Sequence, residues 1–140
     1  MKTKKIISLL LSFALCICIS ACGDESVQND LWKNAVYTQD TSFGNGDKTI
    51  ELEVIAGDKS ITFTVNTDAD NLEDALIEHN IIEGDEGPYG IYIKKVNGIT
   101  ADYDVDQSYW SLSKNGEPLM SGASGVHLNG GEHFEFTHTK

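Results

Sequence analysis

Apolar and polar residues alternate over two neighbouring stretches of the chain, residues 49–56 and 60–67. Such alternation is typical of a strand with one buried face. The residues between them, 57–59, are Gly-Asp-Lys and favour a tight turn, so the two stretches predict a β-hairpin. The face expected to point inward consists of Ile50, Leu52, Val54, Ile61, Phe63 and Val65.

The hydrophobic period then lengthens to that of a helix, which predicts one helix after the hairpin. Asp70 is the expected N-cap, with Glu73 three residues later as in a capping box. Asn80 is expected to end the helix in the left-handed conformation. The face expected to be buried consists of Leu72, Ala75, Leu76 and His79.

The second half of the chain alternates short apolar runs with turn residues. Residues 83–90, which are rich in glycine, are expected to form a loop. Short strands are expected at 91–96, 109–114, 118–120, 126–128 and 132–138. A hairpin, one α-helix and several short strands in a mixed sheet predict an α+β fold, arranged as a small β-grasp-like domain.

Two Asn-Gly pairs, at 97–98 and 115–116, favour turns in which two successive residues have positive φ. Trp110 and Leu112 share one face of the strand between these turns. Trp110 is therefore either the centre of a small core or the floor of a binding surface. We favour the core, because aromatic residues on short strands mostly pack inward.

The N-terminus has the features of an export signal. Three lysines precede an apolar run at 6–19, and the sequence Ile-Ser-Ala-Cys that ends at Cys22 resembles the lipobox of bacterial lipoproteins. Residues 1–22 are therefore expected to be a signal peptide with its lipobox cysteine, and Cys22 to carry a lipid on the outer face of the cytoplasmic membrane. A plain secretory signal is the alternative. Residues 23–47 are polar and predict a flexible tether, and 48–140 the folded domain.

Charge and cysteine content exclude several classes of partner. The chain has 22 acidic residues and 10 lysines without arginine; removing the three leader lysines leaves 7 − 22 = −15. Such a surface repels nucleic acid and anionic head groups, and the absence of arginine removes the usual clamp for phosphates. All cysteines lie at or before Cys22, so no disulfide is expected in the domain.

The alternating acids Asp102, Asp104 and Asp106 resemble the start of a calcium loop. An EF-hand loop needs glycine at its sixth and glutamate at its twelfth position, where this chain has Gln107 and Ser113. A solvated acidic loop is the favoured interpretation.

The histidines near the C-terminus do not form a ligand set either. His133 and His138 differ in parity, so one strand would point them to opposite faces. The chain has no G-x-S-x-G elbow and no Walker pattern, so neither a metal site nor an enzyme is expected.

From residue 96 onward the sequence resembles the C-terminal β-domain of intrinsic factor and transcobalamin, and especially the transcobalamin-like domains of bacterial lipoproteins. The resemblance extends over about residues 49–137. It rests on Val96, Asn97, Gly98, Ile99, Tyr109, Trp110, Pro118, Leu119, Gly122, Phe134 and Phe136. It implies a soluble-ligand-binding β-grasp, which in the vitamin carriers closes over cobalamin held by a helical domain. This sequence contains no counterpart of that helical domain, and a partner chain could supply the missing wall of the site.

Two functions follow from these observations. One is a lipid-anchored, extracytoplasmic protein that captures a cobalamin-like ligand for a transporter through residues 89–122, without another cofactor. The alternative is a cell-surface module that contacts a protein or the cell wall. The candidate ligand-binding residues are Tyr92, Asn97, Tyr109, Trp110, Ser111, Leu112 and Asn115.

Overall fold

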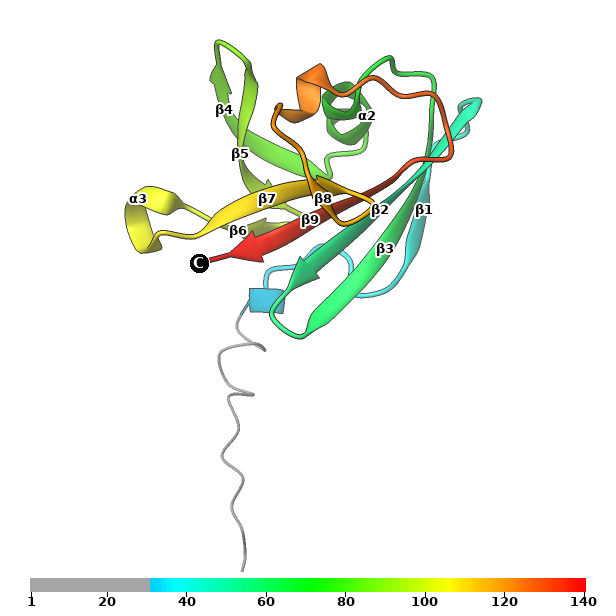
Figure 1. Cartoon of the computed structure of the whole chain (residues 1–140). Coiled ribbons are helices and arrows are strands. Elements are labelled where there is room, and N and C mark those ends of the chain that lie inside the picture. The colour runs from blue at the N-terminus through cyan, green and yellow to red at the C-terminus, as the bar shows by residue number, and fades with distance from the viewer. Residues whose placement is uncertain (1–30) are drawn as a thin grey trace, which may run out of the picture.

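A computed structural model describes residues 31–140, in which a six-stranded mixed sheet forms the larger layer (Figure 1). Its strands lie in the order β1-β3-β2-β9-β7-β8. Their bounds are Thr41–Phe43 for β1, Lys59–Thr67 for β3, Lys48–Ala56 for β2, His133–Thr139 for β9, Tyr109–Lys114 for β7 and Glu117–Pro118 for β8.

The described structure also contains a smaller sheet, in the order β4-β5-β6, and short helical segments, and residues 31 and 32 are helical as well. The strands are β4 (Ile82–Gly87), β5 (Gly90–Val96) and β6 (Ile99–Thr100). The helical segments are α2 (Leu72–Glu78), α3 (Tyr103–Asp106) and the 3-10 turn η1 (Ala123–Gly125). The hairpin of β4 and β5 projects beside α2, and α3 projects at the outer end of β7 (Figure 1).

The hairpin predicted from the alternating pattern is confirmed as β2 and β3. The two strands pair antiparallel from Lys48 with Thr67 to Ala56 with Lys59. Every residue expected on the inward face is buried. Strand β9 then pairs parallel to β2, so that Phe134 and Phe136 join the same apolar face.

Helix α2 forms where the period predicted it, but its cap is one residue later than expected. The side chain of Asn71, not Asp70, accepts a hydrogen bond from the backbone N–H of Asp74 at 2.9 Å. Glu73 does not close a capping box, because its carboxylate accepts from the N–H of Ile91 instead, at 3.0 Å. The N-terminal turn of α2 is therefore tied to β5.

The end of α2 agrees with the sequence. Asn80 has φ of 54°, and the N–H of Ile81 donates to the carbonyl of Leu76 at 2.9 Å. This is the hydrogen bond of a left-handed helix end.

Two expectations for the second half of the chain are wrong. The stretch 83–90 was expected to be a loop, but it contributes most of β4 and the start of β5, with a bulge at Glu83 and Gly84. A Cβ at Gly84 would collide with the carbonyl of Tyr92, so glycine here permits close strand approach instead of breaking the strand. Residues 126–128 form only an isolated bridge between His127 and Asn71.

The expectation of a flexible tether through residue 47 is wrong for residues 31–47, which pack on the domain. Trp32 is 6 % exposed, and its indole N–H donates to the carbonyl of Ala56 at 2.8 Å. The ring of Tyr37 packs edge-on against Phe43 and Phe63. The folded unit therefore includes 31–47; residues 23–30 and the proposed signal with Cys22 lie outside the described residues.

Between residues 31 and 140, none of the helices has the length and apolar character needed to span a bilayer.

Candidate functional site

An open cleft of about 470 Å³ lies where β7, β8 and β9 of the large sheet meet β5, α3 and η1. Most of its lining residues are aromatic or aliphatic. They are Ile91, Tyr92, Ile93, Tyr103, Tyr109, Trp110, Ser111, Leu112, Pro118, Leu119, Ser121, Gly122, Ala123 and Phe136.

Trp110 belongs both to the core and to the wall of this cleft. Strand pairing sets Leu112 opposite Phe136, and Trp110 lies two residues earlier on the same face of β7. The Trp110 ring packs edge-on against Phe136 and is 8 % exposed. Its indole N–H donates to the carbonyl of Ile99 at 3.2 Å, which joins the large sheet to β6. The core role predicted for Trp110 is therefore confirmed, and the same ring also lines the cleft.

The opposite wall of the cleft is fixed by two side-chain hydrogen bonds. Ser124 in η1 donates from Oγ to the carbonyl of Tyr89 at 2.8 Å. The Glu73 carboxylate accepts from Ile91 at 3.0 Å. Gly90 lies between these groups with φ of 100°, and a Cβ there would reach both Glu73 and Ser124. Only glycine allows the β4–β5 hairpin to approach α2 and η1 this closely.

The polar groups of the lining are tyrosine and serine hydroxyls, and none of the lining residues carries a charge at neutral pH. The nearest charged group along β5 is Lys94, which follows the lining residue Ile93. Its ammonium lies 2.8 Å from the Asp85 carboxylate and 3.9 Å from that of Asp102. The hydrogen bond that Lys94 donates to Asp85, followed by the charge of Asp85, raises the pKa of Lys94. Lys94 is thus neutralised by its acidic neighbours, and the cleft itself offers aromatic faces and hydroxyl groups.

Comparison with known proteins identifies the family of this chain. Residues 69–140 match the family model described as a domain of unknown function, DUF4430. The chain belongs to the DUF4430 family. Solved structures similar to this DUF4430 protein include that of a candidate metal binding protein from Ruminococcus gnavus ATCC 29149, which is 35% identical with a TM-score of 0.63. The match covers 67% of this chain and 98% of that chain.

A second similar structure is haptocorrin in complex with cobinamide (Cbi), at 24% identity and a TM-score of 0.54. The match covers 70% of this DUF4430 chain but only 26% of the haptocorrin chain. At this level the likeness concerns the fold alone, and it confirms the α+β fold expected from the resemblance to the vitamin carriers. No curated protein matches the chain.

The DUF4430 structure brings most of the candidate ligand-binding residues together. Those that line the cleft are Tyr92, Tyr109, Trp110, Ser111 and Leu112. Apart from Ala123 and Phe136, the whole lining falls within residues 89–122.

Asn97 and Asn115 do not line the cleft. Both occupy tight turns with positive φ, 53° for Asn97 and 51° for Asn115, as the Asn-Gly pairs predicted. Asn97 is buried and hydrogen-bonds the backbone of Tyr37. Sequence reasoning missed the part of the wall near η1, because its residues are small and carry no regular pattern.

The acidic repeat at 102–106 has a structural role in the described chain. Asp102 caps α3 by accepting from the N–H of Asp104, and Asp106 accepts from the hydroxyl and the backbone N–H of Ser108. The hydroxyl hydrogen bond, followed by the backbone one, lowers the pKa of Asp106.

The two histidines of β9 have separate surroundings. His133 lies among Glu51, Glu53 and Glu135, whereas His138 packs edge-on against Trp110. Within residues 31–140, no group of three or more His, Cys, Asp or Glu side chains is arranged to hold a metal ion.

Proposed function

We propose that this DUF4430 protein binds a flat, neutral organic ligand with hydrogen-bonding groups, of the corrinoid class, and performs no chemistry on it. The observation that carries the proposal is the open cleft of about 470 Å³, whose lining combines aromatic rings with hydroxyls and no charged side chain. Ligand sites are typically clefts of about 300–1,000 Å³ with an apolar lining and a few polar groups. Aromatic faces suit a large planar ligand.

The solved structures with the same fold support this choice of ligand class. The haptocorrin structure contains cobinamide, and the Ruminococcus gnavus protein is described as a candidate metal-binding protein. A bare metal ion would find no carboxylate, imidazole or thiol among the residues that line this cleft. An organic ligand fits the lining better than a free cation.

The cleft covers one face of a large ligand, so the affinity is expected to be modest. Much of the ligand would stay in water while the cost of ordering it remains, which gives a Kd of roughly micromolar. Tighter binding would require a second chain on the open face.

Calorimetric titration with cobalamin and cobinamide tests the proposal, with and without a candidate transporter substrate-binding protein. Tyr92 lines the cleft and Tyr89 does not, so Tyr92→Ala is expected to weaken binding about tenfold while Tyr89→Ala leaves it within about twofold. The absence of binding with both corrinoids in both settings, or equal losses in the two variants, would retire the proposal.

We further propose that Cys22 anchors the protein to the outer face of the cytoplasmic membrane and that it delivers its ligand to a transporter there. The support is the basic leader, the apolar run and the lipobox-like sequence that ends at Cys22.

A further inference from the structure

Large exposed hydrophobic side chains are concentrated in one part of the described chain. Of the eight between residues 31 and 140, only Val36 and Ile77 lie outside residues 89–120. Met120 is 100% exposed, Tyr89 88% and Val105 81%. We call the group in 89–120 the apolar belt; it consists of Tyr89, Tyr92, Tyr103, Val105, Tyr109 and Met120.

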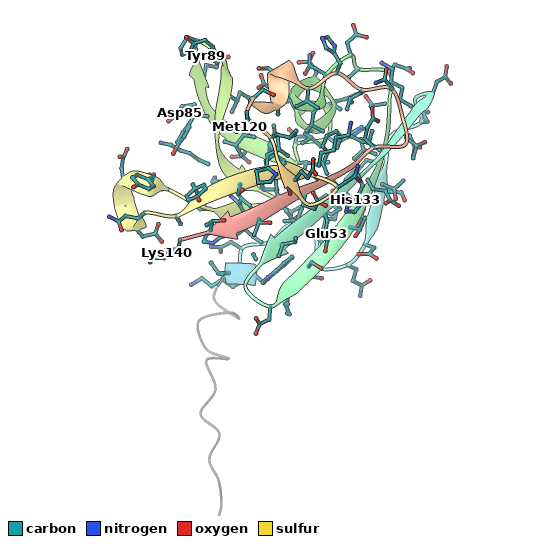
Figure 2. All side chains as sticks on the ribbon, in the orientation of Figure 1. Glu53, Asp85, Tyr89, Met120, His133 and Lys140 are labelled. Atoms are coloured by element: carbon teal, nitrogen blue, oxygen red, sulfur yellow. The ribbon has the colours of Figure 1, made fainter. Side chains whose placement is uncertain are left out.

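The apolar belt belongs to the same segments of the chain that line the cleft. Three of its tyrosines are lining residues, and Met120 lies between the lining residues Leu119 and Ser121. Tyr89 stands at the tip of the β4–β5 hairpin (Figure 2), where Ser124 of η1 binds its carbonyl. Val105 belongs to α3, as does the lining residue Tyr103. The small-ligand cleft explains the three tyrosines that line it, but it leaves Tyr89, Val105 and Met120 without a role.

Large exposed apolar patches mark interaction sites, and the belt holds six of the eight large exposed hydrophobic side chains between residues 31 and 140. A cluster of tyrosine and methionine side chains is also typical of the centre of a protein–protein interface, where these residues are enriched. The side chains that do not line the cleft would gain most from burial, because they are nearly fully exposed.

The negative charge around the belt favours a positively charged partner. Residues 82–120 contain seven acids and three lysines, so their formal charge is 3 − 7 = −4. Asp85 and Asp102 share Lys94. Within the described chain, Glu86 and Glu117 have no ion-pair partner, and Asp104 forms no ion pair but acts on Lys94 through its charge. All three are close to belt residues in sequence: Glu86 on β4 precedes Tyr89, Asp104 on α3 lies between Tyr103 and Val105, and Glu117 on β8 precedes Met120.

We propose that the apolar belt docks a polypeptide segment with an apolar centre and lysine or arginine flanks. The apolar centre would cover Tyr89, Val105 and Met120, and the basic flanks would meet Glu86, Asp104 and Glu117. A second copy of this chain would bring like charges together, and an anionic bilayer would be repelled. The proposal goes beyond the small-ligand function and does not require a ligand in the cleft.

The test measures fluorescence anisotropy of a labelled amphipathic leucine–lysine peptide against residues 23–140, which include every described element. The belt variant combines Tyr89→Ser, Val105→Ser and Met120→Ser, and the control combines Val36→Ser with Ile77→Ser. The belt variant is expected to bind at least about tenfold more weakly, and the control within about twofold of the unsubstituted chain.

A second pair of variants tests the contribution of the acidic residues to peptide binding. Glu86→Gln is expected to weaken binding about threefold at low salt, with little effect at high salt, while Asp58→Asn, in the distant β2–β3 turn, changes nothing. Circular dichroism of each variant confirms that it is folded.

Three results would overturn the proposal: equal affinity of the belt and control variants, equal affinity for a leucine–glutamate peptide, or belt-dependent binding to zwitterionic or anionic vesicles in place of the peptide. Belt-dependent dimerisation in sedimentation runs would replace the basic partner with a second copy. The absence of corrinoid binding in the calorimetric titration would not contradict peptide docking. The corrinoid proposal and the docking proposal can therefore fail separately.

Discussion

The side chain of Asn97 forms two hydrogen bonds with the backbone of Tyr37, sixty residues earlier in the chain. The N–H of Tyr37 donates to Asn97 Oδ1 at 2.9 Å, and Asn97 Nδ2 donates to the Tyr37 carbonyl at 2.8 Å. The N–H of Val36 also donates to the Asn97 carbonyl, at 2.9 Å. One turn residue therefore holds the N-terminal segment of the domain against β5 and β6.

The first prediction compares the two Asn-Gly turns. Asn97→Gly keeps the positive φ but removes both side-chain hydrogen bonds, and it is expected to cost about 2–3 kcal/mol of unfolding free energy. Asn115→Gly is the control, because Asn115 has the same turn conformation but is exposed. Its expected cost is under about 1 kcal/mol. Urea denaturation of both variants measures the difference, and equal losses would contradict the assignment.

The second prediction concerns Trp110. Replacing it with alanine removes a buried indole and leaves a cavity, with an expected cost of about 3–5 kcal/mol. Trp110→Phe keeps most of the packing and loses the hydrogen bond to Ile99, with an expected cost of about 1–2 kcal/mol. Denaturant titration measures the unfolding free energy of both variants. If the Trp110→Ala variant were as stable as the unsubstituted protein, the indole would line the cleft without stabilising the core.

The third prediction concerns residues 31–47. Trp32→Ala is expected to destabilise the protein by about 3–5 kcal/mol, because it opens a buried site and leaves the Ala56 carbonyl without its donor. Val36→Ala, at an exposed position in the same segment, is the matched control. Thermal melts report the difference. Unchanged melting of the Trp32 variant would support the flexible tether instead.

The fourth prediction is a pH dependence at Glu132, which is 8 % exposed. Burial acts to raise the pKa of Glu132, but the backbone N–H groups of Asn129, Glu132 and Gly130 outweigh it, and the pKa is lowered. A lowered folded-state pKa means that the carboxylate stabilises the fold above its unfolded-state value of about 4.3. This contribution is lost as the pH falls through the folded-state pKa.

Glu132→Gln is therefore expected to cost about 1–2 kcal/mol at pH 7 and progressively less in acid. Urea denaturation between about pH 7 and pH 3 measures the difference, and Glu117→Gln on the exposed edge strand is the control. A loss that stays constant with pH would show that the charge of Glu132 is not involved.

The fifth prediction tests the lipid anchor. Cys22→Ala should release the protein from the membrane fraction or leave its leader uncleaved, since the lipobox needs the thiol. Cys18→Ala, within the apolar run, should change neither the mass of the processed protein nor its membrane partition. Mass spectrometry and fractionation measure both. Unchanged partition and mass in the Cys22 variant would exclude lipidation.

The regular elements could be predicted because their hydrophobic residues recur with the period of a strand or of a helix. The alternation through β2 and β3, the helical spacing of α2 and the Asn-Gly turns were all found from local pattern. Local pattern failed for β4, whose residues after Ile82 are exposed. A strand that buries only one side chain carries no hydrophobic period, and its glycines serve close approach instead of a turn.

The docking of residues 31–47 was hidden for a different reason. Trp32 and Tyr37 lie in a short stretch with only a few other apolar residues, too few to show a period. Their partners, Ala56 and Asn97, are distant in sequence. The cleft was located along the chain by its tyrosines. Its lining depends on how β5 packs against β7 and η1, and those tertiary contacts leave no local signature.

The last strand of the chain occupies the middle of the large sheet. Strand β9 lies between β2 and β7, and each of its neighbours has another strand on its far side. The sheet therefore cannot be completed until β9 is available to pair with both neighbours. A chain that emerges from its N-terminus has to stay unfolded, or only partly paired, until β9 has emerged. Closure of the large sheet thus depends on the strand that emerges after all the others, and pairing of the seven-residue β9 is the step on which folding waits.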